Sequence, residues 1–532
     1  MKSLKSRPLF YFLMVTAWGL VLPAPDSLAK AKACNKQPTG VFSEEIFLNV
    51  VTENLPDETL NGQQVQMRVH HVGPVYAQGK CPNVHNYAAV LVHGRSAPGS
   101  PSFDLRMAPT TEDPTGGRLS AQEALAKAGI DSFAPDLLGY GRSWRGPLDD
   151  PCNASLPACV ALNSDGTCPA NAPFLIPPTP INPQFCSPVA VGCDRTRNPV
   201  FPLNQQANKP VGLGVNPGLP LCEHSSPYHF ANPDVFAGNI LDVIDLAIAE
   251  ARPQGGKVVL LGYSFGGPSV GRTLYLLGED AGHKVRRAVF MASLFNLFPA
   301  NPPVLINLPT EEKDLSELER STSFPLSLGN PAGWTGVGSR EAFCTGRITT
   351  DVIDNFWDQI LALDDLAIAW GGTVPNVYDE NGELVQNNAT GLLRSPTFTR
   401  NGWNPEVAHT VTLPTLIMHG LDDGVALPGN SDNMFDELTS VDNKLLVQLE
   451  CSSHQFIGES CSGTRCDDQN PNTTPYGQSV DEPAWKGPHQ TIAAALIEWV
   501  KYGTFNESEC GHFVVNASGV ANEVPTANCP AP

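Results

Sequence analysis

The chain has 532 residues, and its 54 acidic side chains outnumber the 33 basic ones, which gives a net charge of -21. Such an acidic chain is poorly suited to bind nucleic acid or an anionic membrane surface, because both select for basic patches. Only 16% of the residues are charged, while 49 are proline and 47 are glycine. This composition argues against a helical bundle and predicts long irregular loops around a sizeable core.

The first residues have the layout of an export signal. Three basic residues precede an apolar run from Leu9 to Leu22, and small residues follow around Ala29. We therefore expect residues 1–31 to be a signal peptide. The apolar run is shorter than the ~20 residues of a spanning helix, so we expect no membrane anchor. The sequence predicts a secreted or periplasmic protein.

Fourteen cysteines agree with export, because an oxidising compartment lets an even number of cysteines pair as disulfides. Zinc binding is the competing interpretation. The sequence has no C-x-x-C pair and no pair of histidines at ligand spacing, so we expect no metal site and no cofactor. The spacing of the cysteines does not reveal which of them pair.

The first predicted elements belong to a sheet. Two β-rich runs, 45–52 and 64–72, flank a turn at Asn61-Gly62 and predict an antiparallel hairpin. The apolar run 87–92 is typical of a strand buried on both faces. An amphipathic helix and a further strand follow at 119–128 and 131–135. This succession predicts a βαβ unit and a sheet that becomes parallel.

Two long segments interrupt this pattern. Residues 144–233 carry six of the fourteen cysteines and have no helical or strand period, which predicts an insertion held by disulfides. Residues 293–409 contain a helical pattern from Ile353 to Leu363 and several aromatic residues, among them Phe295 and Trp403. We expect a lid over an apolar cavity, or aromatic side chains that only pack the lid onto its base.

The core pattern resumes between and after these segments. It predicts helices at 235–251, 264–277, 432–438 and 490–500, and strands at 257–261, 287–292, 413–419 and 444–449. The tail at 503–532 contains Cys510 and Cys529, and we expect these cysteines to pin it.

The segment Gly262-Tyr263-Ser264-Phe265-Gly266 lies where a predicted strand gives way to a helix. In a G-x-S-x-G turn the glycines are needed because strand and helix pass close to the serine, and the strained turn exposes the hydroxyl. The N–H of Phe265 then lies at a helix N-terminus, where it can donate to an oxyanion. The segment predicts a nucleophile at Ser264.

Two more residues follow strands of the same predicted sheet. Asp423 comes after the strand at 413–419, and His454 comes after the strand at 444–449. The carboxyl ends of parallel strands meet at one edge of a sheet. Acyl transfer through a serine needs a base and an acid that orients the base. The order Ser264, Asp423, His454 supplies both.

These motifs, in this order, resemble the α/β-hydrolase superfamily, and among its members the secreted esterases and lipases. His93-Gly94 is similar to the family's oxyanion loop, and it nominates the N–H of Arg95 beside that of Phe265 as the oxyanion hole. Asp136 to Ser143 resembles the exit of the next strand, and Leu413 to Asp423 matches the strand that carries the acid.

The resemblance implies a mostly parallel eight-stranded sheet with helices on both faces. We expect this core at 45–143, 234–292 and 410–502, with the insertion at 144–233 and the lid at 293–409 between its parts. Some relatives use aspartate as nucleophile for epoxides or haloalkanes, and Ser264 argues against both reactions. No carboxylate follows the strand before the lid, which leaves Asp423 as the acid and Asp422 as its solvated or loop-capping neighbour.

The histidine has two candidates. His454 directly follows the last predicted core strand, whereas His489 directly precedes the last predicted helix. We favour His454, because the base must lie near the sheet edge to reach Ser264, and we keep His489 as the alternative base.

The sequence therefore predicts a secreted serine hydrolase that cleaves a carboxylic ester, small or polymeric, or a lactone. A peptidase or amidase of the same fold is the nearest alternative, because no motif encodes the leaving group. A non-catalytic binding protein on a hydrolase scaffold is the third. The sequence names neither the substrate nor the oligomeric state.

Overall fold

A computed structural model describes residues 37–76, 87–107, 118–146, 230–295, 403–455 and 488–529, except positions 96, 425 and 517–518, and short pieces between 352 and 386. These parts belong to one unit, residues 34–532. The expected signal peptide, most of the predicted insertion and most of the predicted lid lie outside the described residues.

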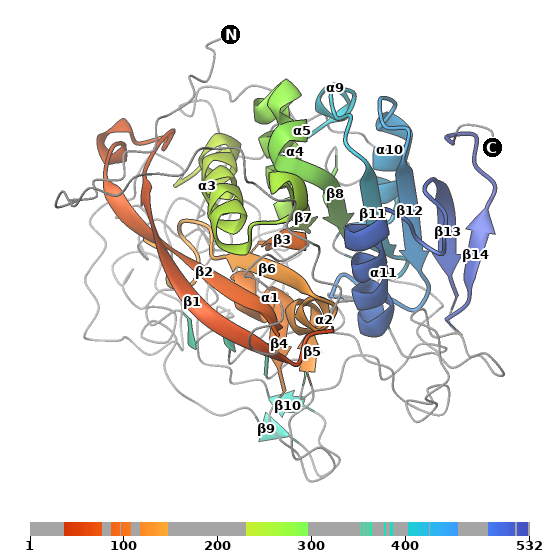
Figure 1. The fold of residues 1–532 in the computed structure, drawn as a ribbon, viewed down its shortest axis with the longest axis horizontal. Helices are drawn as coiled ribbons and strands as arrows, with labels where there is room; N and C mark the ends of the chain where they lie inside the picture. The colour runs from red at the N-terminus through yellow and green to blue at the C-terminus, as the bar shows by residue number, and fades with distance from the viewer. Residues whose placement is uncertain are drawn as a thin grey trace, which may run out of the picture. The chain divides into compact units, whose positions relative to one another are not determined.

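A ten-stranded sheet runs through the described part of the chain (Figure 1), in the order β1-β2-β6-β3-β7-β8-β11-β12-β13-β14. The strands from β6 to β13 in this order are parallel, whereas β1 pairs antiparallel with β2, β2 with β6, and β13 with β14. The strands are β1 (Gly40–Val51), β2 (Gln64–Val75), β3 (Tyr87–Val92), β6 (Ile130–Pro135), β7 (Val258–Tyr263), β8 (Val285–Met291), β11 (Thr415–Gly420), β12 (Lys444–Leu449), β13 (Gly511–Val515) and β14 (Ala521–Val524).

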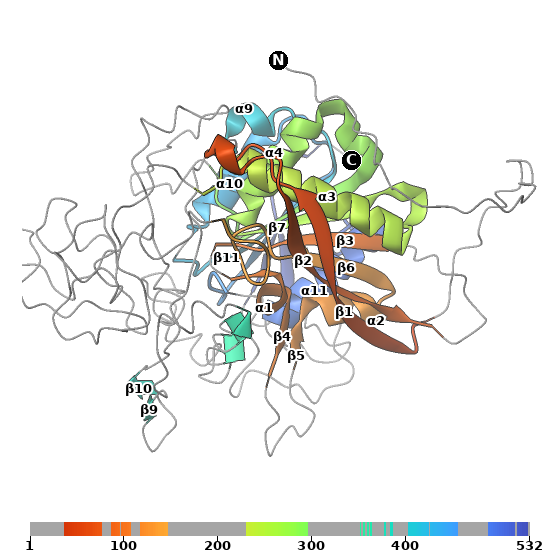
Figure 2. The same cartoon turned by 90° about the vertical axis from the view of Figure 1, so that its left-hand side faces the viewer.

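Helices cover both faces of the sheet, as Figure 2 shows. They are α1 (Gly99–Phe103), α2 (Ala121–Lys127), α3 (Pro233–Ala251), α4 (Gly266–Leu277), α5 (Ala281–Lys284), α9 (Pro405–Ala408), α10 (Gly429–Glu437) and α11 (Pro488–Tyr502). Side chains alternate along β3, so that Val90 and Val92 join the apolar cluster of α3, α4 and α10, while Ala89 and Leu91 join that of α2 and α11. The predicted class, a mostly parallel sheet between two helical layers, is confirmed.

Smaller elements complete the described structure. Two-stranded sheets join β4 (Asp104–Arg106) to β5 (Arg118–Ser120), and β9 (Val377–Tyr378) to β10 (Leu384–Gln386). Short 3-10 helices span Glu58–Leu60, Gln254–Gly256 and Gly278–Asp280. None of the described helices combines the length and the apolar character needed to cross a bilayer.

Capping residues set the helix starts that periodicity places only approximately. The Oγ of Ser120 accepts from the N–H of Glu123, so α2 begins at Ala121 rather than at 119. The side chain of Asn232 accepts from the N–H of Val235 in the same way, so α3 begins two residues before the predicted helix.

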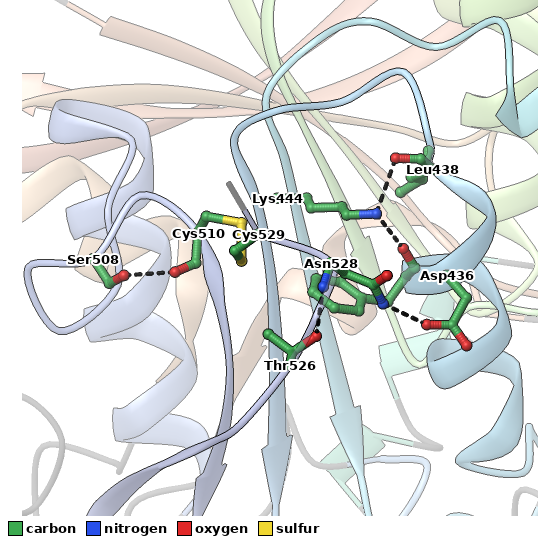
Figure 3. Close-up of a disulfide and its surroundings, with 9 residues drawn as sticks. Asp436, Leu438, Lys444, Ser508, Cys510, Thr526, Asn528 and Cys529 are labelled. Carbon is green, nitrogen blue, oxygen red and sulfur yellow. Dashed lines mark hydrogen bonds between the residues drawn. A yellow bond between two sulfur atoms is a disulfide. The ribbon is translucent and has the colours of Figure 1, made fainter. Parts of the chain in front are cut away.

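The sheet has two more strands than the eight expected. The predicted tail forms β13 and β14, because alternate residues of β13 are buried against the core and its backbone pairs with β12. A disulfide between Cys510 and Cys529 closes this hairpin (Figure 3), and this pairing is one that the spacing of the cysteines left open. Near it, the side-chain amide of Asn528 donates to Asp436 of α10 over 2.6 Å.

Two aromatic residues assigned to the lid lie in the core. Trp403 is fully buried, its ring stacks on that of Phe290 at 4.8 Å, and it meets the ring of Phe295 edge-on at 5.4 Å. For Phe295 and Trp403, packing onto the base is therefore the correct interpretation. Most of the other aromatic residues of the predicted lid lie outside the described residues.

Candidate active site

The serine turn lies between β7 and α4. Ser264 has a φ of 53°, which is the left-handed region that side chains other than glycine rarely adopt. Its N–H donates to the carbonyl of Met291 at the end of β8 over 2.8 Å, so the neighbouring strand holds the strained residue in place. The strain that the G-x-S-x-G pattern predicts is present in the backbone.

Close backbone contacts explain both glycines of this turn. A Cβ on Gly262 would lie 2.4 Å from the carbonyl oxygen of Gly266, and a Cβ on Gly266 would lie 2.3 Å from that of Val92. Any larger residue would therefore separate β7, α4 and β3. The crossing of these three elements leaves Ser264 at the carboxyl edge of the sheet.

Ser264, His454 and Asp423 form a chain of hydrogen bonds. The Nε2 of His454 lies 2.9 Å from the Oγ of Ser264, and its Nδ1 lies 2.7 Å from the Oδ2 of Asp423. The exposed fractions of the three residues are 7%, 5% and 1%. Asp423 follows β11 and His454 follows β12, so adjacent parallel strands deliver the two side chains to one place.

His489 occupies a different place. It is buried in the first turn of α11, the helix that packs on one face of the sheet. The imidazole that bonds both Ser264 and Asp423 is that of His454.

The carboxylate of Asp423 has several partners. Its Oδ1 accepts from the N–H of Ala426 over 2.8 Å, and its Oδ2 lies 3.2 Å from the Nε2 of His419. Burial raises the pKa of Asp423, but the nearby His454 and the hydrogen bonds from His419 and His454 outweigh burial and lower this pKa to about 2. Asp423 is therefore charged at any pH at which a histidine base operates.

Replacing Asp423 with asparagine is expected to lower kcat by roughly 10⁴-fold, because an amide neither fixes the tautomer of His454 nor stabilises its protonated form.

The stability of the same variant should be less sensitive to acid. Because folding lowers the pKa of Asp423, its carboxylate stabilises the fold above about pH 4, and this contribution is lost as the pH falls towards about 2. Denaturant unfolding at several pH values measures the effect, and an identical acid slope in both proteins would contradict it.

The loop after β3 lies against the serine. A Cβ on Gly94 would come within 2.9 Å of the Cβ of Ser264. The preceding His93 is buried, and burial lowers the pKa of its ring. Its Nε2 accepts from the N–H of Leu137 over 3.1 Å, so the proton is on Nδ1, which donates to the carbonyl of Gly94 over 2.6 Å. The loop that carries Arg95 is thus fixed beside Ser264, and Phe265 precedes α4.

A buried carboxylate near this loop links three elements of the fold. Asp136, at the end of β6, forms an ion pair with the guanidinium of Arg68 at 2.9 Å. It also accepts from the N–H of Gly99 over 2.9 Å and from that of Arg142 over 3.2 Å. One side chain therefore links β2, the start of α1 and the turn after β6.

Replacing Gly94 with alanine is expected to lower kcat by about 10- to 100-fold, because the added methyl group must displace either the loop or Ser264. Gly238→Ala is the matched control, since a Cβ at this position of α3 meets nothing within 4 Å. The control should keep full activity and gain about 0.5–1 kcal/mol of stability. Equal activity of the two variants would show that the loop does not need its present position.

Sequence reasoning missed Tyr263 and assigned His419 no role in the site. The hydroxyl of Tyr263 donates to the carbonyl of His454, and the Nε2 of His419 approaches Asp423. Tyr263 occupies a position that the G-x-S-x-G pattern leaves open, so no sequence signal marked it. His419 is the penultimate residue of β11, a position where a packed or loop-bonded histidine also occurs, and its Nε2 lies 2.6 Å from the carbonyl oxygen of Ala426 in the following loop.

The sheet order, the strained serine turn and the serine, histidine and aspartate at one edge define the α/β-hydrolase class of fold. The sequence signature described as the Alpha/beta hydrolase family matches residues 89–461. The match spans more than half of the chain, and the protein therefore belongs to the Alpha/beta hydrolase family.

Several solved structures that this chain matches are distant from it in sequence. A bromoperoxidase from Bacillus anthracis is 13% identical, with 77% of this chain and 94% of that chain covered and a TM-score of 0.34. A serine hydrolase from Cycloclasticus zankles is 13% identical over 78% and 93%, at 0.31. A monoacylglycerol lipase from Paleococcus ferrophilus is 13% identical over 78% and 96%, at 0.31. Likenesses this remote carry no information about the substrate. A search among curated proteins found no significant match.

Proposed function

We propose that the protein is a serine hydrolase that cleaves a carboxylic ester or a lactone through an acyl-enzyme on Ser264. The observation that carries the proposal is the pair of hydrogen bonds made by His454, 2.9 Å to the Oγ of Ser264 and 2.7 Å to the Oδ2 of Asp423. A nucleophile, a base and an acid within hydrogen-bond reach of one another are what acyl transfer through a serine requires.

The proposed reaction has two halves. The Oγ of Ser264 attacks the ester carbonyl while the Nε2 of His454 takes its proton, and the N–H groups of Phe265 and Arg95 donate to the resulting oxyanion. The C–O bond then breaks, His454 returns the proton to the leaving alcohol, and the acyl group stays on the serine. A water molecule then attacks the acyl-enzyme while His454 takes its proton, the bond between the acyl carbon and the Oγ of Ser264 breaks, and His454 returns the proton to Oγ as the carboxylic acid leaves. With a lactone, the alcohol and the acid stay in one product.

Short p-nitrophenyl esters, lactones and peptidyl anilides, assayed in parallel, test the proposed bond. We expect turnover of esters or lactones and none of anilides. The opposite pattern would assign the protein to peptidases or amidases. A folded protein that turns over none of these compounds and takes up no fluorophosphonate would be a binding protein on this scaffold.

We also propose that the protein acts outside the cytoplasm. The disulfide between Cys510 and Cys529 supports this location, as does the disulfide-bonded state of Cys451, because such bonds persist in oxidising compartments. N-terminal sequencing of the exported protein is expected to find a start just after the predicted signal peptide. A mature chain that keeps its first residues would contradict this part of the proposal.

A further inference from the structure

Tyr263 connects the serine turn to the histidine loop. Its hydroxyl donates to the backbone carbonyl of His454 over 2.8 Å, and the side chain is only 3% exposed. Tyr263 is also the residue directly before Ser264. One side chain therefore joins the main chain of the serine turn to the main chain of the histidine.

The surroundings fix both ends of this side chain. The ring of Tyr263 lies in the apolar cluster on the α11 face, edge-on to Phe103 with centroids 6.3 Å apart. It also lies beside the imidazole of His454, with centroids 5.5 Å apart and planes tilted by 32°. A buried phenol keeps a hydrogen-bond partner, because an unsatisfied hydroxyl is costly there. The carbonyl of His454 fills that role.

The histidine loop has other backbone contacts, but they come earlier in the chain. Leu421 donates to the carbonyl of Leu449, and Asp422 donates to that of Ser452, each over 2.9 Å. In the described part of the loop, the bond from Tyr263 is made at His454 itself. It fixes the peptide from which the imidazole projects.

We propose that Tyr263 is a positioning residue, which holds the backbone of His454 at the distance from Ser264 that proton transfer requires. This inference rests on the proposed function of Ser264 and His454. His454 must exchange a proton with Ser264 and then deliver it to the leaving group, so its ring has to keep one placement through both transfers. Displacement of a reacting group by about 1 Å lowers the rate by as much as 10²-fold.

Tyr263→Phe tests the proposal, because it removes the hydroxyl and keeps the ring. We expect kcat to fall about tenfold or more while KM stays within about twofold, since the base moves and the substrate contacts do not. The second-order rate of fluorophosphonate labelling should fall by a similar factor. If Tyr263 had only a structural role, its replacement by phenylalanine would lower the melting temperature and leave kcat and the labelling rate unchanged.

Thr273→Val is the matched control. The Oγ1 of Thr273 donates to the carbonyl of Ser269 over 2.8 Å, and the residue is fully buried in the second half of α4. This variant also loses one buried hydroxyl that bonds a carbonyl, so it should lose stability without losing kcat. Equal kcat in the two variants would overturn the proposal.

Two further replacements of Tyr263 separate the bond from the fold. 4-Aminophenylalanine keeps a donor at the same place, and 4-fluorophenylalanine keeps the volume without one. We expect the amino variant to recover most of the lost kcat and the fluoro variant to recover none. Equal rates in these two proteins would overturn the proposal, even if the phenylalanine variant does not fold.

Ser264→Ala and the unaltered protein separate this inference from the proposed function. If the unaltered protein neither reacts with fluorophosphonate nor turns over esters, the proposed function fails and the role of Tyr263 falls with it. If Ser264→Ala alone loses labelling while Tyr263→Phe is labelled at the normal rate, only the role of Tyr263 is wrong.

Discussion

Replacement of Ser264 by alanine is expected to abolish fluorophosphonate labelling and to lower ester turnover by about 10⁶-fold, because the reaction then has no nucleophile. Stability should change little, since alanine is as strained as serine at a φ of 53°. Labelling assays and initial rates measure the first effect, and thermal unfolding measures the second.

Ser264→Gly gives the same inactive protein with a different stability. Glycine adopts a positive φ without strain, so this variant should be about 0.5–1 kcal/mol more stable than Ser264→Ala, after the larger entropy of glycine in the unfolded chain is subtracted. An inactive but more stable protein would link the backbone strain to function. Activity that survives either replacement would remove Ser264 from the proposed role.

The second large effect distinguishes the two candidate bases. His454→Ala is expected to lower kcat by about 10⁵- to 10⁶-fold, because Ser264 loses the group that takes its proton. His489→Ala should lower kcat by less than about tenfold, since that residue lies in the first turn of α11, whereas the Nε2 of His454 lies 2.9 Å from the Oγ of Ser264.

Melting temperatures of both variants separate lost chemistry from lost folding. His489 is 6% exposed, so its replacement destabilises the protein through a small cavity, and assays should be run well below the melting temperature. Equal losses of kcat in the two folded variants would mean that the hydrogen-bond distances do not identify the base. A larger loss from His489→Ala would reverse it.

Local patterns were enough to predict the parallel core. Buried strands such as Tyr87–Val92 and Lys444–Leu449 are continuous apolar or near-apolar runs, and their predicted limits agree with β3 and β12. Helix starts were less accurate, because a single hydrogen bond that the side chain of Ser120 or Asn232 accepts sets them, and periodicity does not contain that information.

The candidate site was predictable to the extent that strand ends determine it. Ser264, Asp423 and His454 each follow a strand, and the parallel pairing of β7, β8, β11 and β12 brings them to one edge. The choice between His454 and His489 depended on three-dimensional distance, which sequence order does not give. The contact of Tyr263 with His454 joins residues 191 positions apart, and no local pattern records it.

The two additional strands change the position of the base within the sheet. In a sheet that ended at β12, His454 would follow an outermost strand, and outermost strands fray because half of their backbone groups have no partner. Here β12 pairs on both sides, and the N–H of Glu450 bonds the carbonyl of Val515 over 2.9 Å, which extends the pairing towards His454. Local unfolding at this edge of the sheet is therefore expected to begin at β14. The hairpin of β13 and β14 can then open and close while the amide hydrogens of β12 exchange slowly.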